Sequence, residues 1–207
     1  MWPDMHEETL AKPTRKLFDT LGSKAWLSNF YLAGGTALAL QLGHRMSVDL
    51  DFFSAVEFSE QEVIEQLREI GPLEIFQTAR QSVTGALEGV KFSFLGYKYP
   101  VLKRGEPWHD IAIASVEDIA CMKLDALSNR GTKRDFIDVY FIARKIPLPR
   151  MLDLFVQKYS TIGFNLLHVK KSLVYFNDAE DDPMPGMLQP ADWTEVKQFF
   201  VAEVKNL

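Results

Sequence analysis

The sequence predicts an α+β protein, and three observations lead to this fold class. Polar and apolar residues alternate with a period of two in residues 48–53, as in a β-strand. Capping boxes at Ser59 and Ser115 each predict the start of a helix. Helix-like apolar spacing dominates the last third of the chain. We therefore predict a strand-containing core at residues 1–130 and a helical C-terminal region at 131–207 packed on it.

Composition places the chain among ordinary globular proteins. It has 207 residues, of which 47% are hydrophobic and 25% are charged. No apolar run reaches the ~18–20 residues that a membrane span needs. The first eight residues lack the basic and apolar regions of a secretion signal. The lone Cys121 cannot form an internal disulfide, so we expect a cytoplasmic protein.

The elements of the first half follow from local patterns. Residues 8–28 have helical spacing, and the apolar run 31–33 predicts a strand that ends at a Gly-Gly turn. The remaining predicted elements of this half are a helix at 36–42, a strand at 48–53, a helix at 59–70, two or three strands within 73–97 and a short strand at 111–114.

The second half is predicted to be almost wholly helical. A capping box opens a helix at 115–129, which ends before Gly131. Four further helices are expected at 134–145, 149–160, 164–176 and 191–205. The acidic and Pro-rich residues 177–190 are predicted to be an exposed connection before the last helix.

Two aspartates form the first candidate site. Asp49, Asp51 and Phe53 share one face of the predicted strand, with the apolar residues on the other face. Residues two apart on a strand have Cα atoms ~6.5–7 Å apart. Two carboxylates so placed can share one or two hard cations such as Mg²⁺. The alternative is an edge strand with a solvated acidic face.

The Gly34-Gly35 pair precedes these acids, between a strand and a helix. Two glycines let a phosphate approach the backbone closely, and the helix N-terminus adds N–H donors. The Thr36 hydroxyl can add one more donor. The spacing matches neither a P-loop nor a Rossmann fingerprint. The alternative is an ordinary strand-to-helix turn.

Lys123 lies within an apolar stripe of the helix at 115–129, whereas Asp118 and Asp125 are predicted to point away from it. A lysine on a buried face is costly unless its ammonium reaches an anion. The alternative is that the side chain extends to the edge of the helix.

Asp138 is predicted to be partly buried, because it lies between the directions of Phe141 and Ile142 on a helix that is mostly apolar. Arg134, one turn earlier, can pair with it. Asp135 is less constrained. A structural Arg–Asp pair is the alternative to a functional role.

These features combine into two long motifs. The first is residues 34–53, GGTALALQLGHRMSVDLDFF, and the second is residues 118–140, DIACMKLDALSNRGTKRDFIDVY. Together they resemble the AbiEii/AbiGii-type nucleotidyltransferases of the DNA polymerase β-like superfamily, which include toxins of toxin–antitoxin pairs. The resemblance covers roughly residues 30–145 and implies a mixed β-sheet core flanked by helices.

The resemblance implies roles for the first motif. Gly34, Gly35 and Thr36 would bind the phosphates of a nucleoside triphosphate, and Asp49 and Asp51 would act in catalysis by binding Mg²⁺ or Mn²⁺. It also implies nucleotide-binding positions in the loop before the metal-binding strand, namely Arg45 and Ser47.

For the second motif, the resemblance implies that Lys123 contacts phosphate and acts with the two aspartates. Support of the pocket from the helical region would come from Arg134, Asp135 and Asp138.

The implied reaction is Mg²⁺-dependent transfer of a nucleoside monophosphate from an NTP to an acceptor, by a toxin whose partner is an antitoxin. The acceptor class stays open between RNA and protein. One departure favours an alternative, a catalytically silent relative that binds nucleotide or a partner protein. Active members of the superfamily carry a third carboxylate on a following strand, and residues 89–97 contain no acid.

Charge gives little indication of an RNA acceptor. The net charge is −5, so a nucleic-acid partner would need a local basic patch. The residues that can form such a patch are Lys98, Lys103, Arg104, Arg130, Lys133 and Arg134. The alternative, a solvated surface of scattered cations, is the interpretation that we prefer.

Overall fold

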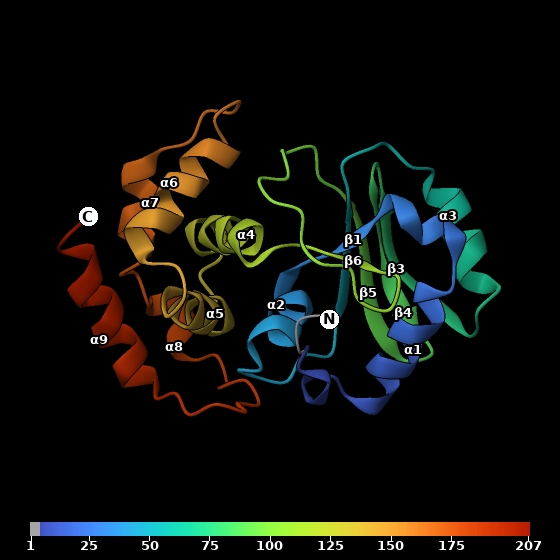
Figure 1. Ribbon diagram of the computed structural model, residues 1–207, viewed down its shortest axis with the longest axis horizontal. Coiled ribbons are helices and arrows are strands. Elements are labelled where there is room, and N and C mark those ends of the chain that lie inside the picture. Colours follow the sequence, from blue (N-terminus) through green and yellow to red (C-terminus); the bar gives the residue numbers. More distant parts are fainter. Residues whose placement is uncertain (1–4) are drawn as a thin grey trace. The chain divides into compact units, whose positions relative to one another are not determined.

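The computed structural model describes residues 5–207 and separates into two compact units, whose elements Figure 1 labels. The first unit comprises the chain up to Pro100 together with Arg104–Ala114. The second comprises Val101–Lys103 and Ser115–Leu207. Whether the chain folds as two domains divided at residue 130 stays a prediction.

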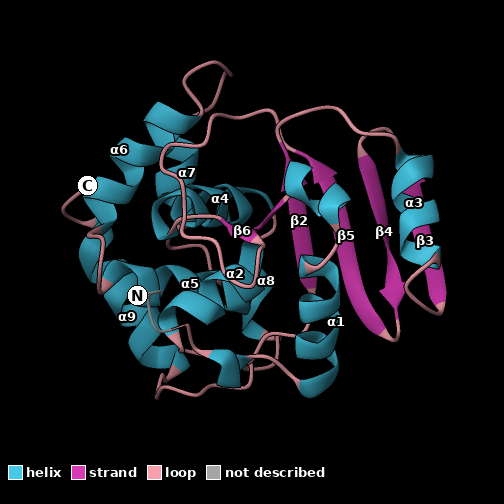
Figure 2. Ribbon diagram, turned by 45° about the vertical axis from the view of Figure 1, so that its right-hand side comes forward, coloured by secondary structure: helices cyan, strands magenta, loops and turns pink. Residues whose placement is uncertain are grey.

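The first unit contains a six-stranded mixed sheet in the order β3-β4-β5-β2-β1-β6 (Figure 2). Strand β2 runs parallel to β5, and β1 runs parallel to β6, whereas the other neighbours are antiparallel. The strands are β1 (Tyr31–Leu32), β2 (Leu50–Ser54), β3 (Leu73–Ala79), β4 (Ser82–Leu87), β5 (Val90–Gly96) and β6 (Ala112–Ile113). The predicted α+β fold class is confirmed.

An aromatic cluster fills one face of this sheet. The ring of Phe94 lies 5.0 Å from those of Phe30 and Phe52 and 5.6 Å from that of Trp26, measured between centroids. Helices α1 and α3 lie over the sheet in Figure 2 and pack on its strands. The helical elements of this unit are η1 (Glu7–Thr9), α1 (Lys12–Gly22), η2 (Ala25–Asn29), α2 (Gly34–Leu42) and α3 (Glu60–Arg68).

Strand β2 begins two residues later than the alternation predicts. Val48 is 52% exposed, and the ladder with β5 starts at Leu50. The Val48 carbonyl accepts a hydrogen bond from Thr14, and the Ser47 N–H donates to the Thr9 carbonyl. Because the backbone at 47–48 is satisfied by these contacts outside the sheet, Asp49 precedes the strand and only Asp51 lies on it.

The second unit is helical, as predicted. Its helices are α4 (Val116–Asn129), α5 (Lys133–Ala143), α6 (Leu148–Lys158), α7 (Leu166–Ser172), α8 (Asn177–Glu180) and α9 (Trp193–Val204). Within residues 5–207, no helix is long and apolar enough to cross a membrane.

The acidic segment 177–190 is mostly exposed, but it is not only a connection. It begins with α8, whose Ala179 is fully buried. The buried Lys133 ammonium donates to the Glu180 carbonyl at 2.9 Å and to the Asp182 carbonyl, and the Lys133 N–H donates to the Asp182 carboxylate at 3.0 Å. These bonds fix the segment to the start of α5.

The burial of Asp118 contradicts a further prediction. It was predicted to point away from the core, yet it is 2% exposed. Its carboxylate accepts the N–H groups of Leu102 and Lys103, each at 3.0 Å, and contacts the buried Lys158 ammonium at 2.7 Å. Donors from distant parts of the chain therefore compensate for its burial.

We expect Lys158→Met to lower the free energy of unfolding by about 3–5 kcal/mol, because the Asp118 carboxylate would stay buried without its cation. Urea unfolding measures the loss. Lys103→Ala is the matched control, since its ammonium pairs with Glu117 at the surface and should contribute less than about 1 kcal/mol. Equal effects of the two substitutions would contradict the expectation.

Candidate functional site

The turn from β1 into α2 leaves no room for side chains. Gly34 has φ +65°, and a Cβ atom added there would lie 3.0 Å from Oδ2 of Asp51. A Cβ atom added at Gly35 would lie 2.5 Å from Nη2 of Arg45, which is itself buried. An acid and a guanidinium thus lie against the backbone of this turn, which only residues without a Cβ atom allow.

Two hydroxyl groups connect this turn to the first aspartate. Thr36 Oγ1 lies 2.8 Å from Ser47 Oγ and donates to the carbonyl oxygen of Asp49. Both hydroxyl groups are buried. Because Thr36 donates its hydroxyl proton to the Asp49 carbonyl, this side chain fixes the backbone of Asp49. A direct contact between Thr36 and phosphate stays a prediction.

The two carboxylates differ in their surroundings. Asp51 Oδ1 accepts a hydrogen bond from Ser93 at 2.8 Å, and Ser93 is the residue paired with Asp51 on the neighbouring strand. The Asp49 carboxylate is half-buried and has no hydrogen-bond or ion-pair partner among residues 5–207. Two hard oxygen donors at one end of β2 fit Mg²⁺, which binds one or two carboxylates together with waters and substrate phosphates.

A third acid does not complete this pair. Within the described chain, no group of three or more His, Cys, Asp or Glu side chains is placed to hold a metal. The strand beside β2 presents Ser93 at the position facing Asp51. The absence of an acid in residues 89–97, noted from the sequence, thus concerns the strand directly adjacent to the two aspartates.

In the second unit, Lys123 is buried in an ionic cluster. Its Nζ lies 2.8 Å from Asp135 and 2.7 Å from Asp138, and the three residues are 6%, 1% and 0% exposed. The predicted burial of Lys123 and Asp138 is confirmed. The cation that contacts Asp138 is Lys123, whereas Arg134, which we expected to pair with it, is exposed.

The charges of this cluster stabilise one another. Burial by itself lowers the pKa of Lys123, but the charges of Asp138 and Asp135 outweigh it, so this pKa lies above its ordinary value. Burial by itself raises the pKa of Asp135, but Lys123 and Arg130 outweigh it, so this pKa lies below its ordinary value. Lys123 and Asp135 are therefore both charged at neutral pH.

Sequence reasoning gave too little weight to Asp135. This residue also accepts hydrogen bonds from Arg130 at 3.0 Å and from the Thr132 hydroxyl at 2.7 Å. A local signal was present, because Thr132 caps α5 by accepting the N–H of Asp135, three residues on. The same Ser/Thr-x-x-acid pattern was used at Ser59 and Ser115, and both of those caps are confirmed.

The glycine turn and the two aspartates belong to the first unit, and the Lys123 cluster belongs to the second. Within the first unit, the predicted approach of Asp51 to the glycine turn is present. A ligand shared between this turn and Lys123 stays a prediction.

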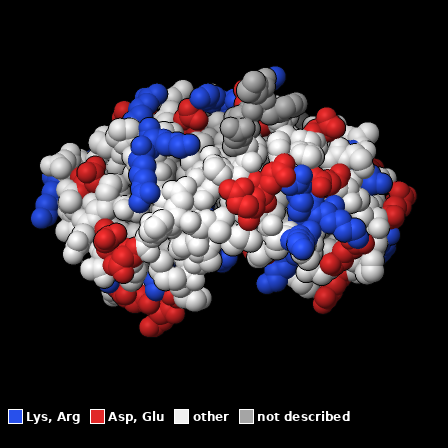
Figure 3. Space-filling model, turned by 60° about the horizontal axis from the view of Figure 1, so that its bottom comes forward, with Lys and Arg blue, Asp and Glu red and all other residues white. Residues whose placement is uncertain are grey.

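Several of the predicted basic residues are already paired or buried. Lys98 pairs with Glu57 at 3.0 Å, Lys103 pairs with Glu117 at 2.7 Å, and Lys133 is buried. On the face drawn in Figure 3, basic and acidic groups are interspersed, with broad areas of neither. Charge therefore does not single out a nucleic-acid surface.

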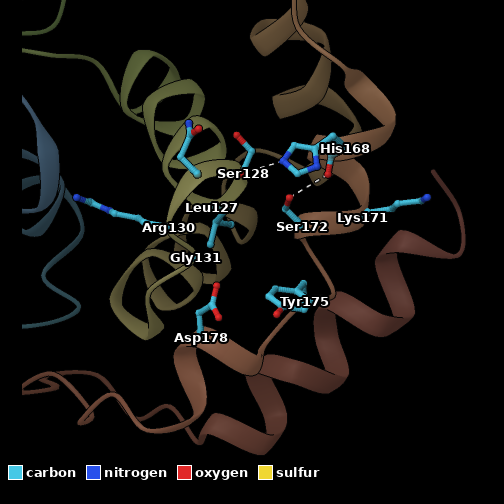
Figure 4. A pocket seen from close by; sticks show the side chains of 10 residues that line it. Leu127, Ser128, Arg130, Gly131, His168, Lys171, Ser172, Tyr175 and Asp178 are labelled. Carbon is cyan, nitrogen blue, oxygen red and sulfur yellow. Dashed lines mark hydrogen bonds between the residues drawn. The ribbon is translucent and has the colours of Figure 1, made fainter.

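The second unit also holds a cavity of about 360 Å³ lined by residues of α4, α7 and α8. Two hydrogen bonds connect residues of its wall, one from His168 to the Ser128 carbonyl and one from Ser172 to the His168 carbonyl. Figure 4 shows the cationic ends of Arg130 and Lys171 directed away from this cavity. It is therefore not a built anion site, and the glycine turn remains the candidate.

Comparison with known proteins assigns the family. The family model described as "Nucleotidyl transferase AbiEii toxin, Type IV TA system" matches residues 15–86 and 97–206. The chain belongs to this AbiEii family. The matched segments leave out residues 87–96, which include all of β5 and the serine that faces Asp51.

This AbiEii-family protein is also similar to individual known proteins. A protein of Aquifex aeolicus strain VF5, named only as uncharacterised, is 38% identical over 203 residues, which cover 95% of this chain and 97% of that protein. The crystal structure of JHP933 from Helicobacter pylori has a TM-score of 0.55 at 18% identity and covers 98% of this chain and 92% of that one.

MenT4, a nucleotidyltransferase toxin of Mycobacterium tuberculosis H37Rv, has a TM-score of 0.56 at 18% identity, over 87% of this chain and 76% of that one. At this level of identity, the two structural comparisons establish the shared fold.

We expect Lys123→Met to lower the free energy of unfolding by about 3–5 kcal/mol, because two buried carboxylates would lose their ammonium. Arg134→Ala, on the exposed side of α5, should change it by less than about 0.5 kcal/mol. Chemical denaturation at pH 7 compares the two variants with the wild type.

The pH dependence has a defined sign. The folded pKa of Asp135 lies below 3.8, so its contribution is present above that value and is lost as the pH falls through the folded pKa. The folded pKa of Lys123 lies above 10.5, so its contribution is lost only as the pH rises beyond that value. The advantage of the wild type over Lys123→Met should therefore shrink below about pH 4. An advantage that stayed constant down to pH 2 would argue against a charged cluster.

Proposed function

We propose that this protein transfers a nucleoside monophosphate from an NTP to an acceptor, with Mg²⁺ or Mn²⁺, as the toxin of a toxin–antitoxin pair in the cytoplasm. The family is one of nucleotidyltransferase toxins. The observation that carries the proposed reaction is the approach of the Asp51 carboxylate to the Gly34 backbone, which brings a metal ligand to a turn suited to phosphate.

The proposal gives each part of the glycine turn a task. Helix α2 has no side-chain cap at Ala33, so its first N–H groups are available to phosphate oxygens. Gly34 and Gly35 would let the phosphates reach those groups, and Arg45 would add positive charge behind Gly35. Asp49 and Asp51 would hold the metal, which when bound would neutralise charge on the phosphates and polarise the acceptor oxygen.

Lys123 fits the proposal as a phosphate ligand with one donor to spare. An ammonium has three N–H donors, and the contacts with Asp135 and Asp138 use two of them. The two carboxylates would fix its position, and Arg134 would remain at the surface with no assigned contact. This role requires that Lys123 and the glycine turn reach the same ligand.

A catalytically silent relative that binds nucleotide is the second candidate, and Ser93 favours it. A serine hydroxyl is a poor base at neutral pH, and this one already donates to Asp51. Without an adjacent third carboxylate, metal and nucleotide binding can persist while transfer is lost.

The first test incubates purified protein with Mg²⁺, each labelled NTP and total RNA or protein. We expect label on one acceptor class, reduced at least about 100-fold by Asp51→Asn, since a metal ligand supplies several kcal/mol of charge stabilisation. Asp153→Asn, an exposed aspartate of α6, is the matched control and should retain transfer. Nucleotide binding without transfer to any acceptor would favour the silent relative.

A second test adds the missing acid. We expect Ser93→Asp to place a third carboxylate beside Asp51 and so to lower the melting temperature in EDTA, because like charges repel. Added Mg²⁺ should restore it and raise it more than in the wild type, because binding to the folded state stabilises. A melting temperature insensitive to Mg²⁺ in both proteins would contradict the metal assignment.

A further inference from the structure

A pocket of about 490 Å³ lies in the first unit, where η2 and the loop after β2 meet the start of α3. Aromatic rings and polar side chains share its wall. We refer to it as the η2–α3 pocket, and six of its lining residues are Trp26, Asn29, Phe30, Phe58, Glu62 and Gln66. Binding sites typically have this size and this mixture of apolar walls with a few polar groups.

The aromatic wall of the pocket is held in place by packing on the sheet. The ring of Phe30 meets Trp26 edge-on at 6.3 Å and Phe58 edge-on at 5.0 Å. Trp26 and Phe30 also contact Phe94, a member of the aromatic cluster. The Gln81 amide donates to the Phe58 carbonyl at 2.8 Å and accepts the Phe58 N–H at 3.1 Å. The rings are therefore fixed by contacts within the chain.

The pocket is separate from the candidate active site. Its rings pack on Phe94, which stacks on Phe52. Phe52 is buried on one face of β2, whereas Asp51 lies on the other face. Among residues 5–207, those that line the pocket include none from the glycine turn or from β2. A ligand of this pocket would therefore serve a role apart from nucleotidyl transfer.

Several polar groups of the pocket have no partner within the described chain. Among residues 5–207, no hydrogen bond or ion pair is made by the carboxylate of Glu62 or by the side-chain amides of Asn29 and Gln66. The Trp26 Nε1 atom is buried, and it also has no hydrogen-bond partner in this range. Because a buried donor without an acceptor is costly, this wall favours a ligand that brings an acceptor.

The charge of the pocket favours a cation. Glu57, which also lines it, already pairs with Lys98 at 3.0 Å and with Arg80 at 3.4 Å. The charge of Glu62 is not offset in this way. Cations are attracted to the faces of aromatic rings, and a guanidinium is the cation best suited to stack on a ring while it pairs with a carboxylate.

We propose that the η2–α3 pocket binds an arginine side chain of a partner protein. The guanidinium stacks on the aromatic wall and pairs with Glu62. The peptide groups beside the arginine bond with the amides of Asn29 and Gln66 and with Trp26 Nε1. The net charge of −5 favours a basic partner. A protein segment fits better than free arginine, because the free amino acid would bring its own carboxylate beside Glu57 and Glu62.

The probe is the peptide acetyl-Gly-Arg-Gly-amide. It is compared with the same peptide containing citrulline, which has nearly the same shape without the charge, and with free arginine. Proton–nitrogen correlation NMR follows the indole N–H signal of Trp26, which Trp26→Phe assigns. Titrations compare the wild type with Glu62→Gln and with Glu65→Gln. Glu65 accepts a hydrogen bond from Gln61 on the exposed side of the same helix, so it is the matched control.

We expect the arginine peptide to shift the Trp26 indole signal with a dissociation constant on the order of 1 mM. The citrulline peptide should bind about 3- to 30-fold more weakly, since it loses the attraction of a cation to the rings. Glu62→Gln should weaken binding of the arginine peptide about two- to fivefold, as expected for a solvent-exposed ion pair. Glu65→Gln should bind like the wild type.

Four results would overturn the arginine site. They are an unshifted Trp26 signal at about 10 mM peptide, equal binding of the citrulline peptide, equal binding of free arginine, and equal affinities of Glu62→Gln and Glu65→Gln. Circular dichroism checks that each variant is folded. The proposed function is judged separately by NTP binding and label transfer, which Glu62→Gln should leave unchanged.

Discussion

The site depends on one steric constraint, which is that two consecutive backbone positions have no space for a side chain. At Gly34 the space is taken by an Asp51 oxygen, and at Gly35 it is taken by the Arg45 guanidinium. Any Cβ atom would push an acid or a cation out of place, and Gly34 also has the left-handed φ that disfavours other residues. The Thr36–Ser47–Asp49 contacts then hold the backbone of Asp49 against the turn.

A second constraint acts in the helical unit, where two buried lysines pair with buried aspartates. Each is compensated by aspartates at 2.7–2.8 Å, Lys123 by Asp135 and Asp138, and Lys158 by Asp118. Burying charge is costly, and ion pairs of this kind often add no net stability over apolar side chains. The two lysines differ in what they hold. Lys158 fixes the segment at 102–103 through Asp118, whereas Lys123 holds two aspartates of α5.

The sequence predicted well those features that depend on residues close together in the chain. The caps at Ser59 and Ser115 need only contacts three residues apart, and the alternation in β2 and β5 reflects a sheet with one buried face. The burial of Lys123 followed from its place within an apolar stripe.

The misses have a common cause, because each depends on a partner distant in sequence. Asp118 was predicted to be outside the core, since its compensating donors at Leu102, Lys103 and Lys158 cannot be read from its own helix. The backbone before β2 lies outside the sheet because it forms hydrogen bonds with Thr9 and Thr14. Periodicity describes one element at a time and contains no information on such contacts.

The serine that faces Asp51 limits what kind of enzyme this site can be. Ser93 provides Asp51 with a hydrogen-bond donor, which stabilises the carboxylate but cannot remove a proton from an acceptor. Catalysis would then have to depend on position and on charge stabilisation more than on a general base. Phosphates fixed by a rigid turn would contribute to that positioning, and proximity alone can supply ≈ 7–11 kcal/mol of a barrier. A site that orients both reactants well can therefore tolerate the absence of the third acid better than a site that orients only one.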